Sequence, residues 1–160
     1  FIERNDLEKP LKLINFLEKI EVKKKYPNTI IIKVYETKPI AILFKKNAKF
    51  LLDSSSNLIT FNKNMIAGNF PNVFGEGAEH KFINFFNQLE NNNFPSKRVK
   101  NLYYFQIGRW DLQLLNNQII KLPSDRTAKA IQQSIELLNH KDFKNYSIID
   151  LRVHDKIVVE

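Results

Sequence analysis

Apolar and polar residues follow helix-like and then strand-like patterns over the first forty residues. Apolar side chains recur at helical steps over residues 7–17, at Leu7, Leu11, Ile14 and Leu17. Residues 20–26 and 30–35 alternate with the period of a strand, and Pro27-Asn28 between them supplies turn chemistry. The pattern predicts a helix followed by an antiparallel hairpin. The hairpin should end at Lys38-Pro39, because proline has no backbone N–H to donate to the ladder.

From residue 45 onward the chain carries a longer series of strand and helix patterns. Strands are predicted over residues 50–52, 58–61, 102–107, 110–114, 118–122, 149–153 and 157–159, and apolar and polar residues alternate in 110–114 and 149–153. Apolar helical stripes cover residues 78–89 and 128–138, the second after a cap at Ser124 or Asp125. Residues 70–75 predict a loop with apolar anchors. We therefore predict an α+β fold, with a mostly antiparallel sheet and two packed helices.

Composition limits the classes of protein to consider. At 160 residues the chain can form one ordinary domain or two small ones. It contains no cysteine, which excludes a disulfide scaffold, a thiolate metal site and a cysteine nucleophile. No apolar run approaches the roughly 20 residues that span a bilayer. The chain begins at Phe1, within a predicted element and without an initiator methionine, so we expect it to be part of a longer protein.

The formal net charge of +8 suggests an anionic partner or a background rich in lysine and asparagine. Lys97, Arg98 and Lys100 precede the aromatic run Tyr103–Phe105, a combination found in single-strand-binding platforms. The run lacks the residue order of an RNA-recognition strand, and strand alternation would bury half of it. We therefore predict no nucleic-acid partner, with a basic nucleic-acid-binding domain as an alternative.

Residues that could carry catalysis or bind a metal are few. The three histidines lack a helical partner at the spacing of a zinc site. Glu76, Glu79 and His80 form one acidic cluster, but it lies at a helix start, where acidic residues offset the helix dipole. The sequence contains no nucleophile elbow, phosphate-binding glycine loop or dinucleotide fingerprint. We predict a protein that is not an enzyme, with no metal, cofactor or small-molecule substrate.

The strand Ile157-Val158-Val159 is the best candidate for a binding site. A terminal strand is often a sheet edge, where unpaired N–H and C=O groups can accept a strand from a partner. The alternative is a strand that is paired on both sides inside the sheet. If the edge is open, we expect Val158→Pro to remove a ladder donor and abolish partner binding.

Six short motifs, in order along nearly the whole chain, resemble those of the FtsQ/DivIB family of bacterial cell-division proteins. They are Tyr26–Ile30, Val34–Ala41, Leu52-Asp53 with Leu58-Ile59, Phe70–Ala78, Arg109–Leu112 with Asn116-Asn117, and Ile149–Arg152. The first resembles the family's aromatic-Pro-Asn-Thr-Leu, and the second its Val-x-Glu-Arg-x-Pro-Val-Ala. The loop Gly75–Ala78 and the C-terminal end are most similar to alphaproteobacterial members.

The resemblance implies a domain organisation and a location. Residues 1–44 would be the C-terminal part of a POTRA domain that lacks its first strand and helix, and residues 45–160 the family's β domain. The whole protein would cross the cell inner membrane once, through an N-terminal helix absent from this sequence. The residues present here would lie in the periplasm, at the division septum.

The resemblance also implies a non-enzymatic scaffold of the divisome that binds FtsB and FtsL, together with other divisome proteins. A strand of FtsB would be added to the last strand of the β domain. Carried over by residue, the contacts fall on Arg152, Val153, Ile157, Val158 and Val159, with Arg109 as a further contact. Arg152 would pair with a carboxylate of the partner. Where well-known members carry an aromatic residue after Asp-Leu-Arg, this chain has Val153, so β-branched packing must replace that contact.

One further alternative is a POTRA-bearing chaperone of outer-membrane protein assembly or secretion. Such proteins usually carry several POTRA repeats, so the sequence that precedes Phe1 would distinguish the two. A single apolar segment of about 20 residues there would support the cell-division scaffold.

Overall fold

A computed structural model describes residues 17–61, 63 and 68–160. The chain divides into two compact units, Phe1–Pro39 and Ile40–Glu160. The helix predicted over residues 7–17 lies outside the described residues except for Leu17, which begins a strand. Among the described residues, no helix has both the length and the apolar character needed to cross a bilayer.

The first unit contains the predicted hairpin. Strand β1 (Leu17–Lys25) pairs antiparallel with β2 (Thr29–Glu36), which confirms this prediction. Ile20 lies opposite Val34, and Val22 opposite Ile32, so one face of the hairpin is apolar.

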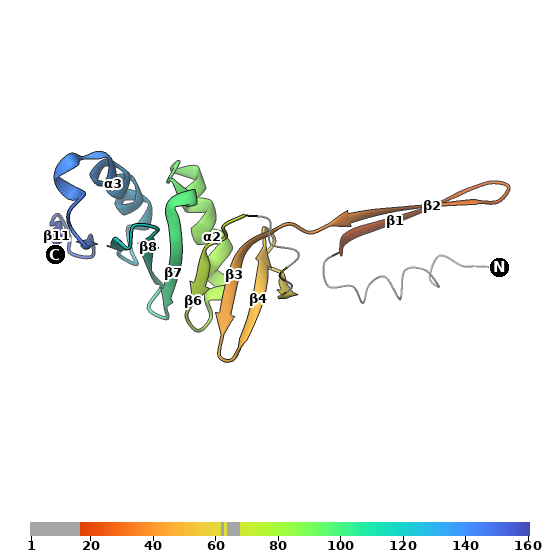
Figure 1. Cartoon of the computed structure of the whole chain (residues 1–160), viewed down its shortest axis with the longest axis horizontal. Coiled ribbons are helices and arrows are strands. Elements are labelled where there is room, and N and C mark those ends of the chain that lie inside the picture. The colour runs from red at the N-terminus through yellow and green to blue at the C-terminus, as the bar shows by residue number, and fades with distance from the viewer. Residues whose placement is uncertain (1–16, 62, 64–67) are drawn as a thin grey trace. The chain divides into compact units, whose positions relative to one another are not determined.

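The second unit is built on one sheet of nine strands, in the order β11-β10-β9-β8-β7-β6-β3-β4-β5 (Figure 1). The strands are β3 (Pro39–Lys45), β4 (Ala48–Asp53), β5 (Leu58–Thr60), β6 (Asn72–Phe74), β7 (Val99–Phe105), β8 (Arg109–Leu114), β9 (Ile119–Lys121), β10 (Ile148–Asp150) and β11 (Val158–Val159). The helices are α2 (Ala78–Asn91) and α3 (Thr127–Asn139), with short 3₁₀ turns η2 (Ser96–Arg98) and η3 (Lys141–Phe143). The predicted α+β class is confirmed.

The sheet is mixed. Pairs β4–β5, β7–β8, β8–β9 and β10–β11 are antiparallel, whereas β3–β6, β6–β7 and β9–β10 are parallel. Strand β6 corrects the prediction of a loop over residues 70–75. Pro71 and Gly75 flank β6, and in the sequence these two residues indicate a loop. The segment is nevertheless a strand, because it pairs with β3 and β7, which are distant in sequence. Gly75 follows at φ 120°, where an added Cβ would lie 2.2 Å from the carbonyl oxygen of Tyr104.

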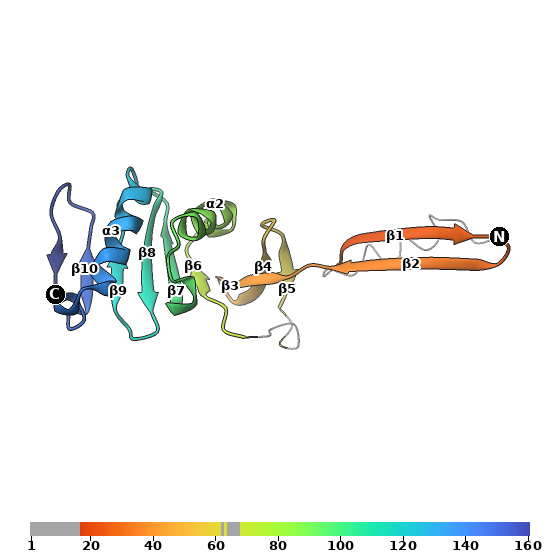
Figure 2. The same cartoon turned by 90° about the horizontal axis from the view of Figure 1, so that it is seen from above.

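A row of apolar side chains, the core row, crosses the sheet beneath the two helices. Its members are neighbours on successive strands: Leu43, Val73, Leu102, Leu112, Ile120, Ile149 and Val159. Helices α2 and α3 lie on this side of the sheet (Figure 2) and pack against the row through residues such as Phe82 and Ile131. Because the first six members are at most 1% exposed, this row is the centre of the hydrophobic core.

A second row, the open row, crosses the same strands on the other side. Its members are Phe44, Phe74, Tyr103, Asp111, Lys121, Asp150 and Val158. The three aromatic rings stack on one another, with centroids 4.8 Å and 5.2 Å apart. The stack therefore covers both faces of Phe74 and one face each of Phe44 and Tyr103, which weighs against a base-stacking platform.

Candidate partner-docking edge

Strand β11 lies at one end of the nine-stranded sheet, and no strand of the described chain pairs with its outer side. Its inner side pairs with β10. Glu160 and Ile148 exchange two backbone hydrogen bonds, each 3.1 Å long. Because hydrogen-bonded and non-hydrogen-bonded pairs alternate in an antiparallel ladder, Val158 forms the next hydrogen-bonded pair with Asp150. The N–H and C=O of Val159 therefore point away from β10, toward the open edge.

This register changes the expected effect of proline in β11. The backbone N–H of Val158 faces β10, so Val158→Pro would remove a bond within the sheet rather than a bond to a partner. The residue whose N–H faces outward is Val159. The sequence could not show this, because the direction of each N–H depends on which residue of β10 lies opposite.

The predicted apolar contacts are exposed along this edge. Val153, Ile157 and Val158 are 48%, 39% and 43% exposed. Val159 is half-buried and packs against the core as the last member of the core row. The edge thus combines open backbone groups with uncovered apolar side chains.

Arg152 is paired within the chain. Its Nε donates to Asp150 Oδ1 at 2.8 Å, its Nη2 donates to Asp150 Oδ2, and its backbone N–H donates to Oδ1 at 3.0 Å. The side-chain hydrogen bond from Arg152 holds the pKa of Asp150 below its usual value. A carboxylate of a partner would therefore share Arg152 with Asp150 or displace it.

Arg109, the other arginine predicted to contact a partner, lies on β8. Its guanidinium carbon lies 4.0 Å from the centroid of the Phe105 ring, and its Nε lies 3.2 Å from Asp111 Oδ1. That contact is an ion pair without hydrogen-bond geometry, because both buried atoms lack a hydrogen-bond partner. Burial raises the pKa of Asp111 above its usual value, and the charge of Arg109 offsets this only in part. Arg109 is mostly buried and offers a partner little surface.

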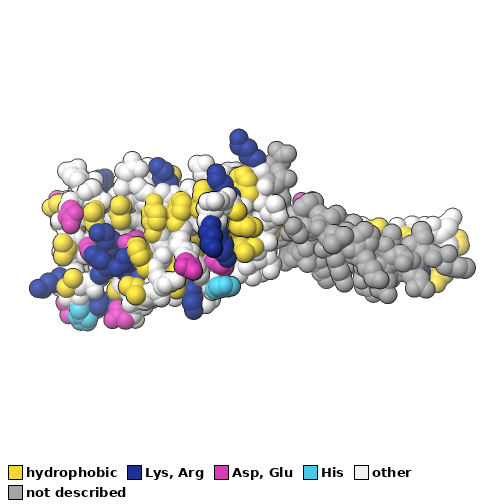
Figure 3. Space-filling view, turned by 90° about the horizontal axis from the view of Figure 1, so that it is seen from below, with side chains coloured by type: hydrophobic (Ala, Val, Ile, Leu, Met, Phe, Trp, Pro, Cys, Tyr) yellow, Lys and Arg dark blue, Asp and Glu magenta, His cyan; other side chains and the backbone are white. Residues whose placement is uncertain are grey.

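The charged part of the open row thus unites two predicted residues that are distant in sequence. Asp111, Lys121 and Asp150 are neighbours on β8, β9 and β10, and Arg109 and Arg152 contact the two carboxylates. Figure 3 shows a compact group of Lys and Arg side chains, bordered by acidic side chains, toward the C-terminal end of the large sheet.

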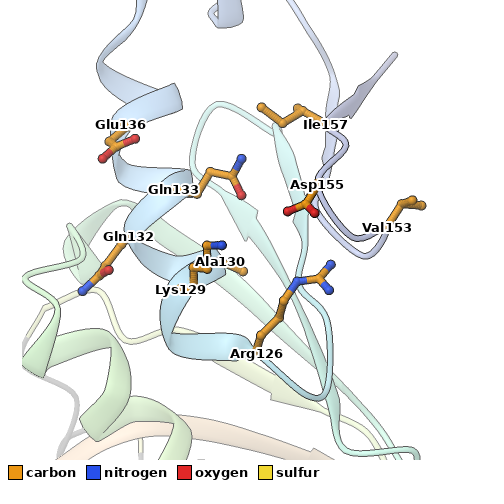
Figure 4. A pocket seen from close by; sticks show the side chains of 9 residues that line it. All are labelled: Arg126, Lys129, Ala130, Gln132, Gln133, Glu136, Val153, Asp155 and Ile157. Atoms are coloured by element: carbon orange, nitrogen blue, oxygen red, sulfur yellow. The ribbon is translucent and has the colours of Figure 1, made fainter.

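A groove of about 530 Å³ lies beside β11, between α3 and the segment that connects β10 to β11 (Figure 4). Sequence reasoning missed this groove. Its lining residues are Arg126, Lys129, Ala130, Gln132, Gln133, Glu136, Val153, Asp155 and Ile157. The α3 side is mostly polar, so only the apolar residues of the connecting segment gave a signal in the sequence. Helix α3 begins at Thr127 after Arg126, without a side-chain cap, which corrects the cap predicted at Ser124 or Asp125.

The acidic cluster of Glu76, Glu79 and His80, considered above as a metal site, contains side chains that are paired with each other or with Lys45. Glu79 forms an ion pair with Lys45, and His80 lies 3.8 Å from the same carboxylate oxygen. Burial of Glu79 favours its neutral form, but hydrogen bonds and the charge of Lys45 outweigh this and lower its pKa. The described residues include no group of three or more acidic or histidine side chains placed to hold a metal.

Comparison with known proteins establishes the family. The family model described as cell division protein FtsQ/DivIB, C-terminal, matches residues 41–152. The chain belongs to the FtsQ/DivIB family. The matched segment covers most of the chain and includes the nine-stranded sheet as far as β10. The family predicted from the motifs is confirmed.

Curated relatives agree. FtsQ of Rickettsia prowazekii is 31% identical over 167 residues, which cover 99% of this chain and 60% of the relative. FtsQ of Rhizobium meliloti is 26% identical, with 97% of this chain and 52% of the relative covered. The chain therefore spans between half and two thirds of these relatives. The solved extracytoplasmic domain of DivIB from Geobacillus stearothermophilus is 14% identical, with a TM-score of 0.43, and covers 61% of this chain and 87% of that one.

Proposed function

We propose that this chain is the periplasmic part of a non-enzymatic divisome scaffold, which binds FtsB, and through it FtsL, by strand addition to β11. The family membership supports a role in cell division. The single observation that carries the binding mode is the register of β11, which directs the N–H and C=O of Val159 away from the sheet. Strand addition needs such open groups.

The edge geometry also suggests how the contacts share the binding energy. Each added ladder bond contributes a net ~0.5–1.5 kcal/mol. Exposed Ile157 and Val158 provide apolar surface that a partner could cover. Arg152 is already paired with Asp150, so we assign it to orienting the partner rather than to affinity.

We further propose that the first unit is the C-terminal part of a POTRA domain. Its antiparallel hairpin, and the fact that it forms a compact unit of its own, support this. Strand β3 belongs to the large sheet, so the boundary is better placed at Pro39 than at the predicted residue 44. In the whole protein, a single membrane-spanning helix would precede this part and hold it at the septum.

The test is a binding titration with the periplasmic part of FtsB from the same bacterium. Val159→Pro removes the outward N–H, and we expect at least about tenfold weaker binding. Val159→Ala keeps that N–H and should lose less affinity. Emission of the buried Trp110, the single tryptophan of the chain, verifies that each variant is folded. If folded Val159→Pro bound FtsB as tightly as the unchanged protein, strand addition at β11 would be excluded.

A further inference from the structure

Arg126 connects α3 to the segment that carries β11. Its Nη2 donates to the backbone carbonyl oxygens of Leu151 at 3.3 Å and of Arg152 at 3.2 Å. These residues directly follow β10 and begin the connection to β11. Arg126 itself occupies the N-cap position of α3, where its carbonyl accepts from the N–H of Ala130 at 3.1 Å. The guanidinium therefore extends from a helix packed on the core to the start of the C-terminal hairpin.

The connection between β10 and β11 has few other attachments. Residues 152–157 are exposed, and the other hydrogen bonds that they form within the described chain are local, such as the bond from Lys156 N–H to Val153 O at 3.4 Å. Strand β11 itself has only two residues. A short ladder at the end of an exposed segment opens easily, because few contacts hold it closed. The two carbonyl contacts of Arg126 thus fix the segment at its beginning.

We propose that Arg126 is a positioning residue of the docking edge. It does not need to touch the partner. By holding the carbonyls of Leu151 and Arg152, it keeps the hairpin in the position in which β11 pairs with β10 and presents Val159 outward. The inference rests on the proposed strand addition for its effect on binding. Its effect on the free protein is independent of any partner.

The first arm of the test measures amide hydrogen exchange in the free protein, by NMR, at residues Glu160 and Leu112. In Arg126→Gln we expect the Glu160 amide, which donates to Ile148, to exchange about three- to tenfold faster. The Leu112 amide, in the centre of the sheet, should be unchanged. Arg126→Lys should fall between the two, since an ammonium lacks the planar fork that can bridge two acceptors.

The matched control is Lys129→Gln. Lys129 lines the same groove on the same helix and carries the same charge, but within the described chain it forms no hydrogen bond to the hairpin. We expect its Glu160 exchange to equal that of the unchanged protein. Equal exchange at Glu160 in Arg126→Gln and in the unchanged protein would overturn the inference, whatever the partner does. Trp110 emission verifies the fold of each variant.

The second arm measures binding of the same periplasmic part of FtsB. Arg126→Gln should weaken binding by the factor by which the population of the closed hairpin falls, as calculated from the Glu160 exchange rates, whereas Lys129→Gln should leave binding unchanged. Equal weakening in both variants, removed by salt, would indicate charge attraction and overturn the positioning role. Binding that weakens less than the measured fall in the closed population requires would leave Arg126 as a structural contact of the free protein and overturn its role at the docking edge.

Discussion

The core row and the open row cross the same strands, yet they are built in opposite ways. From Leu43 to Ile149 the core row is apolar and buried throughout. The open row begins with stacked aromatic rings and continues with the charged residues Asp111, Lys121 and Asp150. The rows also end differently, since Val159 packs on the core while Val158 is 43% exposed. The difference indicates that the core row stabilises the fold. The open row changes from aromatic to charged side chains as it approaches the β11 edge.

The largest effect should come from the centre of the core row. Leu112 is fully buried, so Leu112→Ala should lower the free energy of unfolding by about 2–5 kcal/mol through lost burial and a cavity. Urea unfolding followed by Trp110 emission measures it. The control is Leu115→Ala, because Leu115 is 54% exposed and should change stability by less than about 0.5 kcal/mol. Equal losses would contradict the role of the core row.

A smaller effect is expected from the aromatic part of the open row. Phe74 stacks between Phe44 and Tyr103, and each such pair contributes about 0.5–1.5 kcal/mol beyond burial. Phe74→Ala should therefore destabilise the large unit by about 1–3 kcal/mol in the same urea titration. Phe74→Leu keeps apolar contact but loses the stacking, and should cost less. FtsB affinity should be unchanged in the folded variants, and a loss of binding would move the docking surface onto this face.

The sequence predicted these rows where the pattern lies within one strand, and failed where it depends on pairing between strands that are distant along the chain. Alternation in residues 110–114 identified Leu112 as a core position, because one strand determines which side chains share a face. The sequence could not predict the neighbours of Phe74, because β6 pairs with β3 and β7, which are distant along the chain. The three residues of β6, between Pro71 and Gly75, are also too few to show an alternating pattern.

The candidate site was predicted in location but not in detail. The β-branched Ile157–Val159 indicated an edge strand. The hydrogen bonds between Glu160 and Ile148 determine that the N–H of Val159 points outward, and no local sequence pattern predicts this pairing. Arg126 was missed because an arginine beside two good capping residues gives no sign of contacts with Leu151 and Arg152.

The smallest effect concerns the charged end of the open row. The pKa of Asp150 is lowered in the fold, mainly by the hydrogen bond from Arg152, so its ionised form stabilises the fold. This contribution is fully present above the unfolded-state pKa of about 3.9 and is lost as pH falls through the lowered folded value. Because Arg152 is partly exposed, we expect a contribution of at most about 1 kcal/mol.

Asp150→Asn tests this contribution. The difference in unfolding free energy between the two proteins should be constant above about pH 5 and should decline as the pH falls below about 4. Urea titrations at several pH values measure it. A difference that stays the same down to pH 2 would show that the ionised carboxylate is not the stabilising group.

The central claim is that FtsB adds a strand to the outer side of β11, and the amide of Val159 tests it most directly. In the free protein, the Glu160 amide should exchange slowly and the Val159 amide quickly, because only the first is bonded within the sheet. On saturation with the periplasmic part of FtsB, we expect the Val159 amide to become at least about tenfold slower. A Val159 amide that stays fast in a saturated complex would contradict the claim.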